Sequence, residues 1–182
     1  MCRDSYFPYF CIGMKVGILS DTHGFLHPRI VNFFKDVDEI WHAGDIGNMN
    51  TYQALEDSKP LRAVYGNIDG QDLRIRCPDI HFFQVEQAQV LLTHIGGYPG
   101  RYDRKAKELI KQKKPALFVC GHSHILKVMY DKTHELLFIN PGAAGKFGSH
   151  KSITAIRMVI EGKTFKDLEV LDIPRGSREV GK

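Results

Sequence analysis

Five short polar clusters, each at the end of an apolar run, constrain the fold of this chain more than any other feature. The clusters are Asp21-Thr22-His23 after KVGILS, Gly44-Asp45 after EIWHA, Gly66-Asn67 after LRAVY, His94 after VLLT, and Gly121-His122-Ser123-His124 after ALFVC. Successive clusters are separated by 24, 22, 27 and 28 residues, counted from Asp21 through Asp45, Asn67 and His94 to His122. Such spacing returns the chain to the same edge of a sheet, where the ligand sites of α/β folds lie. We therefore expect the clusters to converge.

The first half of the chain alternates between extended and helical patterns. Apolar runs predict strands over 15–20, 39–43 and 61–65, and helical patterns over 26–35 and 50–58 connect them. Strands that are nearly continuous in apolar residues are typical of a parallel sheet that is buried on both faces.

The second half is richer in strands. Extended runs at 81–86 and 89–93, separated by Gln87-Ala88, predict a hairpin. A helix before Pro115 and a strand at 116–120 follow, and then come β-rich runs at 125–130, 136–139, 152–160 and 164–171, the last two joined by a turn at Glu161-Gly162. Many strands with few late helices favour two stacked mixed β-sheets flanked by helices, an α/β/β/α sandwich, over a single open sheet.

The length of 182 residues fits one domain, which we assign to 14–182. We interpret residues 1–13 as an N-terminal extension, because their short apolar stretch lacks the cleavage site of a secretory signal. No apolar run reaches the ~18 residues of a membrane helix. The four cysteines form no CxxC pair, so neither a disulfide framework nor a thiolate zinc site is indicated. We therefore expect a cytoplasmic protein that does not bind a membrane.

The charge of the chain is mildly basic, with a net charge of +4 and a pI of 8.8. This balance suits a phosphate-bearing substrate but falls short of a nucleic-acid-binding composition. The densest basic stretch, 101–114, has the pattern of an amphipathic helix, so a solvated lysine-rich face is favoured over an RNA or DNA contact.

The converging residues are of the types that bind metal ions: two aspartates, one asparagine and four histidines. They are Asp21, His23, Asp45, Asn67, His94, His122 and His124. Oxygen and imidazole donors without thiolate suit Mn²⁺, Fe, Zn²⁺ or Ni²⁺ better than Ca²⁺. In D-x-H and H-x-H the ligands are two residues apart, so an extended chain projects both to one face. Because the set exceeds the needs of one ion, we expect two divalent metal ions, with Mn²⁺ the first choice.

The series D-x-H, G-D, G-N, H and G-H-x-H resembles the calcineurin-like metallophosphoesterase superfamily. The segments MKVGILSDTHG, HAGDI, YGNID, LLTH, CGHSH and INPGAAG are most similar to its small bacterial and archaeal YfcE-like branch. The resemblance extends from Met14 to about Gly162.

The resemblance implies a dinuclear centre with assigned ligands. One metal would be held by Asp21, His23 and His124, the other by Asn67, His94 and His122, and Asp45 would bridge them. It also implies in-line attack of a metal-activated hydroxide on phosphorus, with Asp45, Asn67 and His94 as catalytic residues. The substrate would be a small phosphoester, with a diester favoured over a monoester, and self-association would be common.

Two residues and one loop depart from the pattern of the relatives: Ile68, Ala143 and the loop 95–100. Ile68 stands where many of them have a histidine that can protonate the leaving group, so we expect weaker catalysis on poor leaving groups. Asp69 is interpreted either as an orienting group or as a turn residue. The loop 95–100 is interpreted either as a substrate pocket or mobile lid, or as an ordinary flexible loop. Ala143 replaces a serine that is often present after N-P-G.

Other functions are weighed against hydrolysis of a phosphoester. A Vps29-like protein-interaction scaffold that binds metal with little or no turnover is the main alternative, and an amide hydrolase lacks any signature such as HExxH. Gly145-Lys146 does not form a phosphate loop, because Phe147 follows it. His42 is interpreted as a buried, hydrogen-bonded histidine or as a residue that supports a metal ligand.

Overall fold

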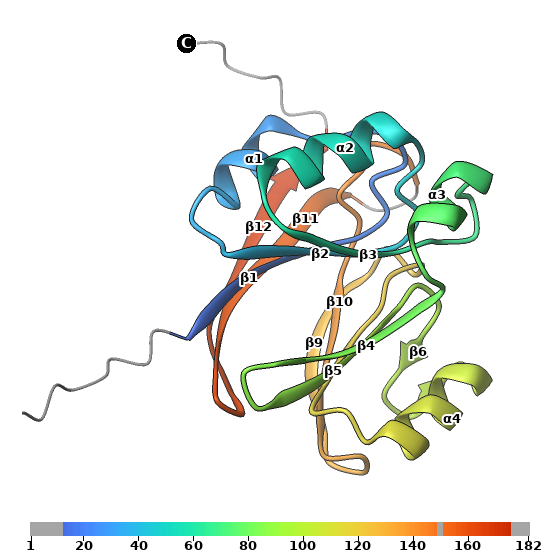
Figure 1. Cartoon of the computed structure of the whole chain (residues 1–182), viewed down its shortest axis with the longest axis vertical. Helices are drawn as coiled ribbons and strands as arrows, with labels where there is room; N and C mark the ends of the chain where they lie inside the picture. Colours follow the sequence, from blue (N-terminus) through green and yellow to red (C-terminus); the bar gives the residue numbers. More distant parts are fainter. Residues whose placement is uncertain (1–12, 149–150, 176–182) are drawn as a thin grey trace, which may run out of the picture.

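Two stacked mixed sheets form the centre of the fold in the computed structural model, which describes residues 13–148 and 151–175 (Figure 1). The first sheet has the order β12-β11-β1-β2-β3, with β1 (Met14–Leu19), β2 (Glu39–Ala43), β3 (Leu61–Val64), β11 (Ser152–Glu161) and β12 (Thr164–Pro174). Its strands β1, β2 and β3 are parallel, whereas β11 is antiparallel to both β1 and β12.

The second sheet has the order β4-β5-β8-β10-β9, with β4 (Ile80–Val85), β5 (Ala88–Thr93), β8 (Leu117–Val119), β9 (Leu126–Asp131) and β10 (Leu136–Pro141). Strands β5, β8 and β10 are parallel, and each edge strand is antiparallel to its neighbour. The predicted hairpin of β4 and β5 is thus confirmed.

Helices cover the outer faces of both sheets. These are α1 (Pro28–Phe33), α2 (Met49–Ser58), α3 (Gln71–Arg76) and α4 (Arg104–Lys113). In Figure 1, α1 and α2 lie over the first sheet and α4 lies under the second. The predicted α/β/β/α sandwich is confirmed. None of the helices in the described ranges has the length and apolar character needed to span a bilayer.

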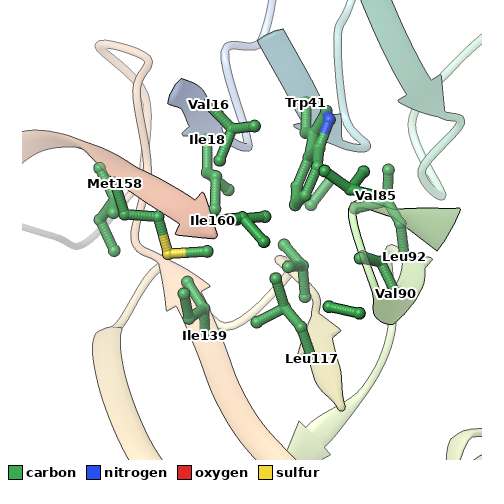
Figure 2. Packing of buried hydrophobic residues seen from close by; sticks show 14 of the residues in the cluster. Val16, Ile18, Trp41, Val85, Val90, Leu92, Leu117, Ile139, Met158 and Ile160 are labelled. Atoms are coloured by element: carbon green, nitrogen blue, oxygen red, sulfur yellow. The ribbon is translucent and has the colours of Figure 1, made fainter. Parts of the chain in front are cut away.

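The core between the sheets follows from the alternation of side chains along each strand. Val16 and Ile18 of β1 and Trp41 of β2 meet Val90 and Leu92 of β5 between the sheets (Figure 2). The intervening residues face outward and pack against the helices, such as Leu19 and Ile40 under α1 and Leu91 and Phe118 against α4. At roughly 25 cal/mol per Å² of buried apolar surface, these layers supply most of the driving force for folding.

Two predicted helices begin later than their patterns indicate. The helix expected from residue 26 begins at Pro28, because His27 accepts a hydrogen bond from the backbone N–H of Arg29 as the N-cap. The helix expected over 101–114 begins at Arg104, because the Asp103 carboxylate caps the N–H groups of Lys105 and Ala106.

Three short elements were not predicted from the sequence. Helix α3 follows the third polar cluster directly, and the loop after His94 contains a two-stranded hairpin, β6 (Gly97–Tyr98) with β7 (Arg101–Tyr102). The base of this hairpin is tied down by a hydrogen bond from the N–H of Asp103 to the carbonyl of Gly96. The loop therefore contains regular structure.

Candidate metal centre

The polar clusters lie at the carboxyl ends of parallel strands from both sheets. Asp21 and His23 follow β1, Asp45 follows β2, Asn67 follows β3, His94 follows β5, and His122 and His124 follow β8. Because β1 to β3 run in one direction and β5 and β8 run in one direction, each sheet delivers its clusters to one edge. The two edges meet, because Asp21 lies beside His124 and Asp45 lies beside His94.

One group of possible metal ligands consists of Asp21, His23 and His124, whose ligand atoms all lie within 4.8 Å of one another. Nε2 of His124 lies 3.2 Å from Oδ1 of Asp21 and 3.3 Å from Nε2 of His23. One carboxylate with two imidazoles is a donor set that suits a first-row divalent ion.

A second group consists of Asp21, Asp45 and His94, again within 4.8 Å of one another. Nε2 of His94 lies 3.3 Å from Oδ1 of Asp45 and 3.0 Å from Oδ1 of Asn67. Asp21 therefore belongs to both groups, whereas the resemblance assigned the shared position to Asp45. Asp45 lies in the second group alone, so its role as the bridging ligand stays a prediction.

His122 occupies the rim of the second group. Its ring centroid lies 5.2 Å from that of His94, and its backbone N–H donates to Oδ2 of Asp21. The side chain is exposed and belongs to neither group of clustered ligand atoms. Its assignment as a ligand accordingly stays a prediction.

One feature of Asp21 supports a bound cation at this site. Oδ1 of Asp21 is the one buried side-chain oxygen or nitrogen among the described residues that has no hydrogen bond. Its carboxylate is fully buried, and the imidazole of His124 lies beside it, with Nε2 at 3.2 Å from Oδ1. A buried carboxylate oxygen without a hydrogen bond is costly unless a positive charge pairs it, which is what a divalent ion does.

The backbone of the site is held in an uncommon conformation. Five of the seven candidate ligands have φ between 49° and 67°, in the left-handed region: Asp21, His23, Asp45, His122 and His124. Each such non-glycine residue costs on the order of 1 kcal/mol or more and persists only where neighbouring contacts impose it. The N–H groups of Asp21 and His23 donate to the carbonyls of Gly44 and Asp45, which ties the first two loops together.

Glycines beside the ligands leave space that a larger residue would fill. A Cβ on Gly66 would lie 2.0 Å from Oδ1 of Asp45, and one on Gly44 would lie 2.6 Å from Nδ1 of His94. A Cβ on Gly121 would lie 2.8 Å from Oδ2 of Asp21. The glycine of each G-D, G-N and G-H motif thus lies where a side chain would collide with a candidate ligand of a different loop.

His42 supports two of the loops. It is fully buried, and burial lowers its pKa to about 4, so the ring is neutral at pH 7. Its Nδ1 accepts the N–H of Gly44, so Nε2 carries the proton and donates to the hydroxyl of Thr22, which donates to the carbonyl of Ile46. The interpretation of His42 as a buried, hydrogen-bonded histidine is consistent with these contacts, and the chain of bonds also positions the Asp45 loop.

Asp69 braces the second and third loops. Its buried carboxylate accepts the N–H groups of Gly47 at 2.7 Å, Gly66 at 2.8 Å and Ile46 at 3.2 Å. These three donors flank Asp45 and Asn67 in sequence. Asp69 is thus more than a turn residue, and it orients the loops that carry the ligands.

Two supporting residues carried no role in the sequence analysis. Asn140 of the N-P-G element is buried and donates from Nδ2 to the carbonyl of Gly121 and to the hydroxyl of Ser123, which holds the loop of His122 and His124. An asparagine inside a buried strand was the signal that could have found it. Arg74 of α3 donates to the backbone carbonyls of the G-N loop.

The histidines and carboxylates shift the pKa values of one another. Burial opposes ionisation of Asp45, but hydrogen bonds from His94 and from the N–H of Ile68 outweigh it and lower the pKa of Asp45. Burial disfavours the charged form of His94, yet Asp45 and the Ala43 carbonyl raise the pKa of His94 overall. Nδ1 of His94 lies 2.8 Å from that carbonyl, which leaves Nε2, the candidate ligand atom, directed at Asn67 and Asp45.

A cavity of about 320 Å³ adjoins the second group of ligands. Its lining includes Asn67 and His94 together with Ile95 and the charged residues Arg74 and Lys105. The loop after His94 thus contributes to a pocket through Ile95, whereas Ile68 is 47% exposed beside Asn67 and offers no proton donor. Ala143 is fully buried.

Comparison with known proteins agrees with this geometry. The "Calcineurin-like phosphoesterase superfamily domain" profile matches residues 14–163. A protein of Methanothermobacter thermautotrophicus named probable metallophosphoesterase is 27% identical over 135 residues, which are 71% of this chain and 77% of that protein. A phosphodiesterase of Methanocaldococcus jannaschii is 26% identical over 146 residues, which are 71% of this chain and 83% of that enzyme.

A solved structure shares the fold. The single-residue variant of Vps29 from Entamoeba histolytica has a TM-score of 0.69 and 17% identity, covering 88% of this chain and 99% of Vps29. At that identity the likeness concerns the fold alone. The profile match spans every polar cluster of the candidate metal centre, from Asp21 to His124. The chain therefore belongs to the calcineurin-like phosphoesterase superfamily.

Proposed function

We propose that this protein is a dinuclear metal-dependent phosphodiesterase. The observation that carries the proposal is the pair of carboxylate and histidine groups that share Asp21, with a buried carboxylate oxygen of that residue left without a hydrogen bond. The phosphoesterase superfamily supports the reaction class, and the phosphodiesterase of Methanocaldococcus jannaschii supports a diester as the substrate.

The proposal assigns the seven candidate ligands to two ions. Asp21, His23 and His124 would hold one ion, Asn67, His94 and His122 would hold the other, and Asp45 would be shared between them. Mn²⁺ is our first choice, and Fe, Zn²⁺ or Ni²⁺ also suit these donors. Two such ions, when bound, supply Lewis acidity toward the phosphoryl oxygens and the attacking water.

The chain itself positions the reacting groups. The N–H of Ile68 donates to Oδ1 of Asp45 at 3.1 Å, which holds that carboxylate beside Nε2 of His94. The side-chain amide of Asn67 lies with its oxygen 3.0 Å from Nε2 of His94, so its NH₂ group can donate to a phosphoryl oxygen. Because Ile68 has no proton to give, esters with good leaving groups should be hydrolysed best.

The test combines metal analysis with hydrolysis of bis(p-nitrophenyl) phosphate in the presence of Mn²⁺. We expect two metal ions per chain in the wild type and a loss of about a hundredfold or more in kcat/KM for Asp45→Asn and His94→Ala. His134→Ala is the matched control, because His134 lies outside the site and bonds to Asp131 instead. Activity that survives both site substitutions contradicts the proposal, and binding of a single ion contradicts the dinuclear centre.

A protein-interaction scaffold is the second candidate, and an exposed apolar strand favours it. Strand β9 is an edge strand of the second sheet, and four of its residues are 36% to 58% exposed: Leu126, Val128, Met129 and Tyr130. Exposed apolar edge strands are common sites of association, with other proteins or with a second copy of the chain. Metal binding without hydrolysis of any diester would favour this function over catalysis.

A further inference from the structure

The cavity beside the second ligand group connects the candidate metal centre to helix α3 and to the start of α4. Its lining includes the candidate ligands Asn67 and His94 and the charged residues Arg74, Asp79, Asp103 and Lys105. Its volume of about 320 Å³ lies at the lower end of small-molecule pockets, which span ~300–1,000 Å³. A short organic group attached to a phosphate at the ligands would extend into this space.

Arg74 is held rigidly at the wall of the cavity. Its Nε donates to the carbonyl of Asp69, its Nη2 donates to the carbonyls of Gly66 and Asn67, and its guanidinium lies 4.4 Å from the centroid of the Tyr65 ring. A guanidinium has five N–H donors, and within the described residues Nη1 makes no hydrogen bond. Two donors of a preorganised cation are therefore available.

Arg74 differs from Lys105 in a second way: within the described residues, no carboxylate forms an ion pair with it. Lys105 forms an ion pair with Asp79, and the Asp103 carboxylate caps the first N–H groups of α4. Arg74 forms no ion pair with any of the described residues, because its bonded acceptors are three neutral carbonyls. A cation in this setting gains most from an anionic ligand.

We propose that this cavity accepts the non-leaving substituent of the phosphodiester, and that Arg74 binds an anionic oxygen, of a carboxylate or a second phosphate, carried by that substituent. The inference rests on the proposed phosphodiesterase function and names its substrate class. The favoured substrates are diesters in which a short chain joins the scissile phosphate to a second anionic group.

The test compares two p-nitrophenyl phosphodiesters that differ in one group: the 2-carboxyethyl ester and the neutral 2-carbamoylethyl ester. Both release p-nitrophenolate, so the ratio of their kcat/KM values isolates recognition of the carboxylate. We expect the wild type to favour the carboxylate by about tenfold, the size of one charge-assisted hydrogen bond at a partly exposed site. Arg74→Gln should lower the ratio to about one.

Two further variants separate recognition from general damage to the metal site, since Arg74 also contacts the Asn67 loop. Arg76→Gln is the matched control on the same helix, because Arg76 pairs with Glu56 and does not line the cavity, and it should keep the wild-type ratio. If Arg74→Gln hydrolyses neither ester, the same ratio of kcat/KM values is measured for Arg74→Lys. A retained preference for the carboxylate supports the inference, and a ratio of one overturns it.

The remaining outcomes separate a failure of this inference from a failure of the proposed function. A wild type that hydrolyses both esters equally, or a preference that Arg74→Gln leaves unchanged, overturns the inference while the phosphodiesterase function stands. A metal-loaded wild type that hydrolyses neither ester contradicts the proposed function, and this inference with it.

Discussion

Gly66 and Asp45 approach so closely that a Cβ on Gly66 would lie 2.0 Å from Oδ1 of the carboxylate. The φ of Gly66 does not lie in the left-handed region, so the requirement for glycine is one of space and not of backbone conformation. The glycine of the third loop thus protects a candidate ligand on the second loop.

Gly66→Ala should displace the Asp45 carboxylate, and we expect it to lower metal affinity by about tenfold or more, since ligands need near-ideal placement. Gly70→Ala is the matched control, because a Cβ on Gly70 meets nothing within 4 Å. Isothermal titration calorimetry with Mn²⁺ measures the metal affinity of both variants. Equal affinity of the two variants would show that the Asp45 loop adjusts without consequence for the metal.

Asp69→Asn should loosen both loops that Asp69 braces. An amide has one acceptor oxygen in place of two, so at least one of the three N–H groups of Ile46, Gly47 and Gly66 loses its partner inside the protein. We expect a loss of about 1–3 kcal/mol in the free energy of unfolding, or a Tm lower by roughly 2–10 °C. Asp72→Asn, at an exposed position on α3, should leave Tm unchanged. Scanning calorimetry measures the Tm of both variants, and an equal Tm for the two would contradict the bracing role of Asp69.

Addition of Mn²⁺ should raise Tm, because an ion that binds only the folded state stabilises it by mass action, about 2.7 kcal/mol at one hundred times Kd. His124→Ala should reduce this rise, since His124 belongs to the first ligand group. EDTA should reverse the shift in the wild type. A metal-dependent shift of the same size in His124→Ala as in the wild type would remove His124 from the ligand set.

The stability of the fold should depend on Asp131 at acid pH. Its carboxylate accepts the hydroxyl of Tyr102 at 2.8 Å, Nδ1 of His134 at 2.9 Å and the N–H of Thr133 at 2.8 Å. Burial alone would raise the pKa of Asp131, but these hydrogen bonds outweigh it and lower the pKa below its usual range. The stabilisation is therefore complete above the unfolded carboxyl pKa of about 4 and is lost as pH falls through the folded value.

We accordingly expect Asp131→Asn to cost about 1–2 kcal/mol at pH 7 and markedly less near pH 3, measured by urea denaturation. Asp172→Asn, at an exposed position, serves as the reference. A penalty that does not change with pH would show that the ionised carboxylate is not what stabilises this cluster.

Long apolar strands and their polar ends were predictable because they are local signals. The strand at 39–43 was predicted with the bounds of β2, and the strand at 61–65 differs from β3 by one residue. Helix α3 has six residues with Leu73 as its one buried position, which is too short for a repeating apolar pattern. Strands β6 and β7 have two residues each and were missed for the same reason.

The sequence by itself determined the residue types of the site and their return to one edge, because each candidate ligand directly follows an apolar run. Only the tertiary structure decided how they group. Asp21 and His124 approach across a gap of more than one hundred residues, and this contact places Asp21 in the first ligand group. Its closeness to Asp45 and His94 places it in the second group as well. The roles of Asp69 and Arg74 likewise depend on which backbone groups fold within 3.5 Å of their side chains. The bonds from Ile46 and Gly47 to Asp69 join two separate loops, and no local pattern encodes them.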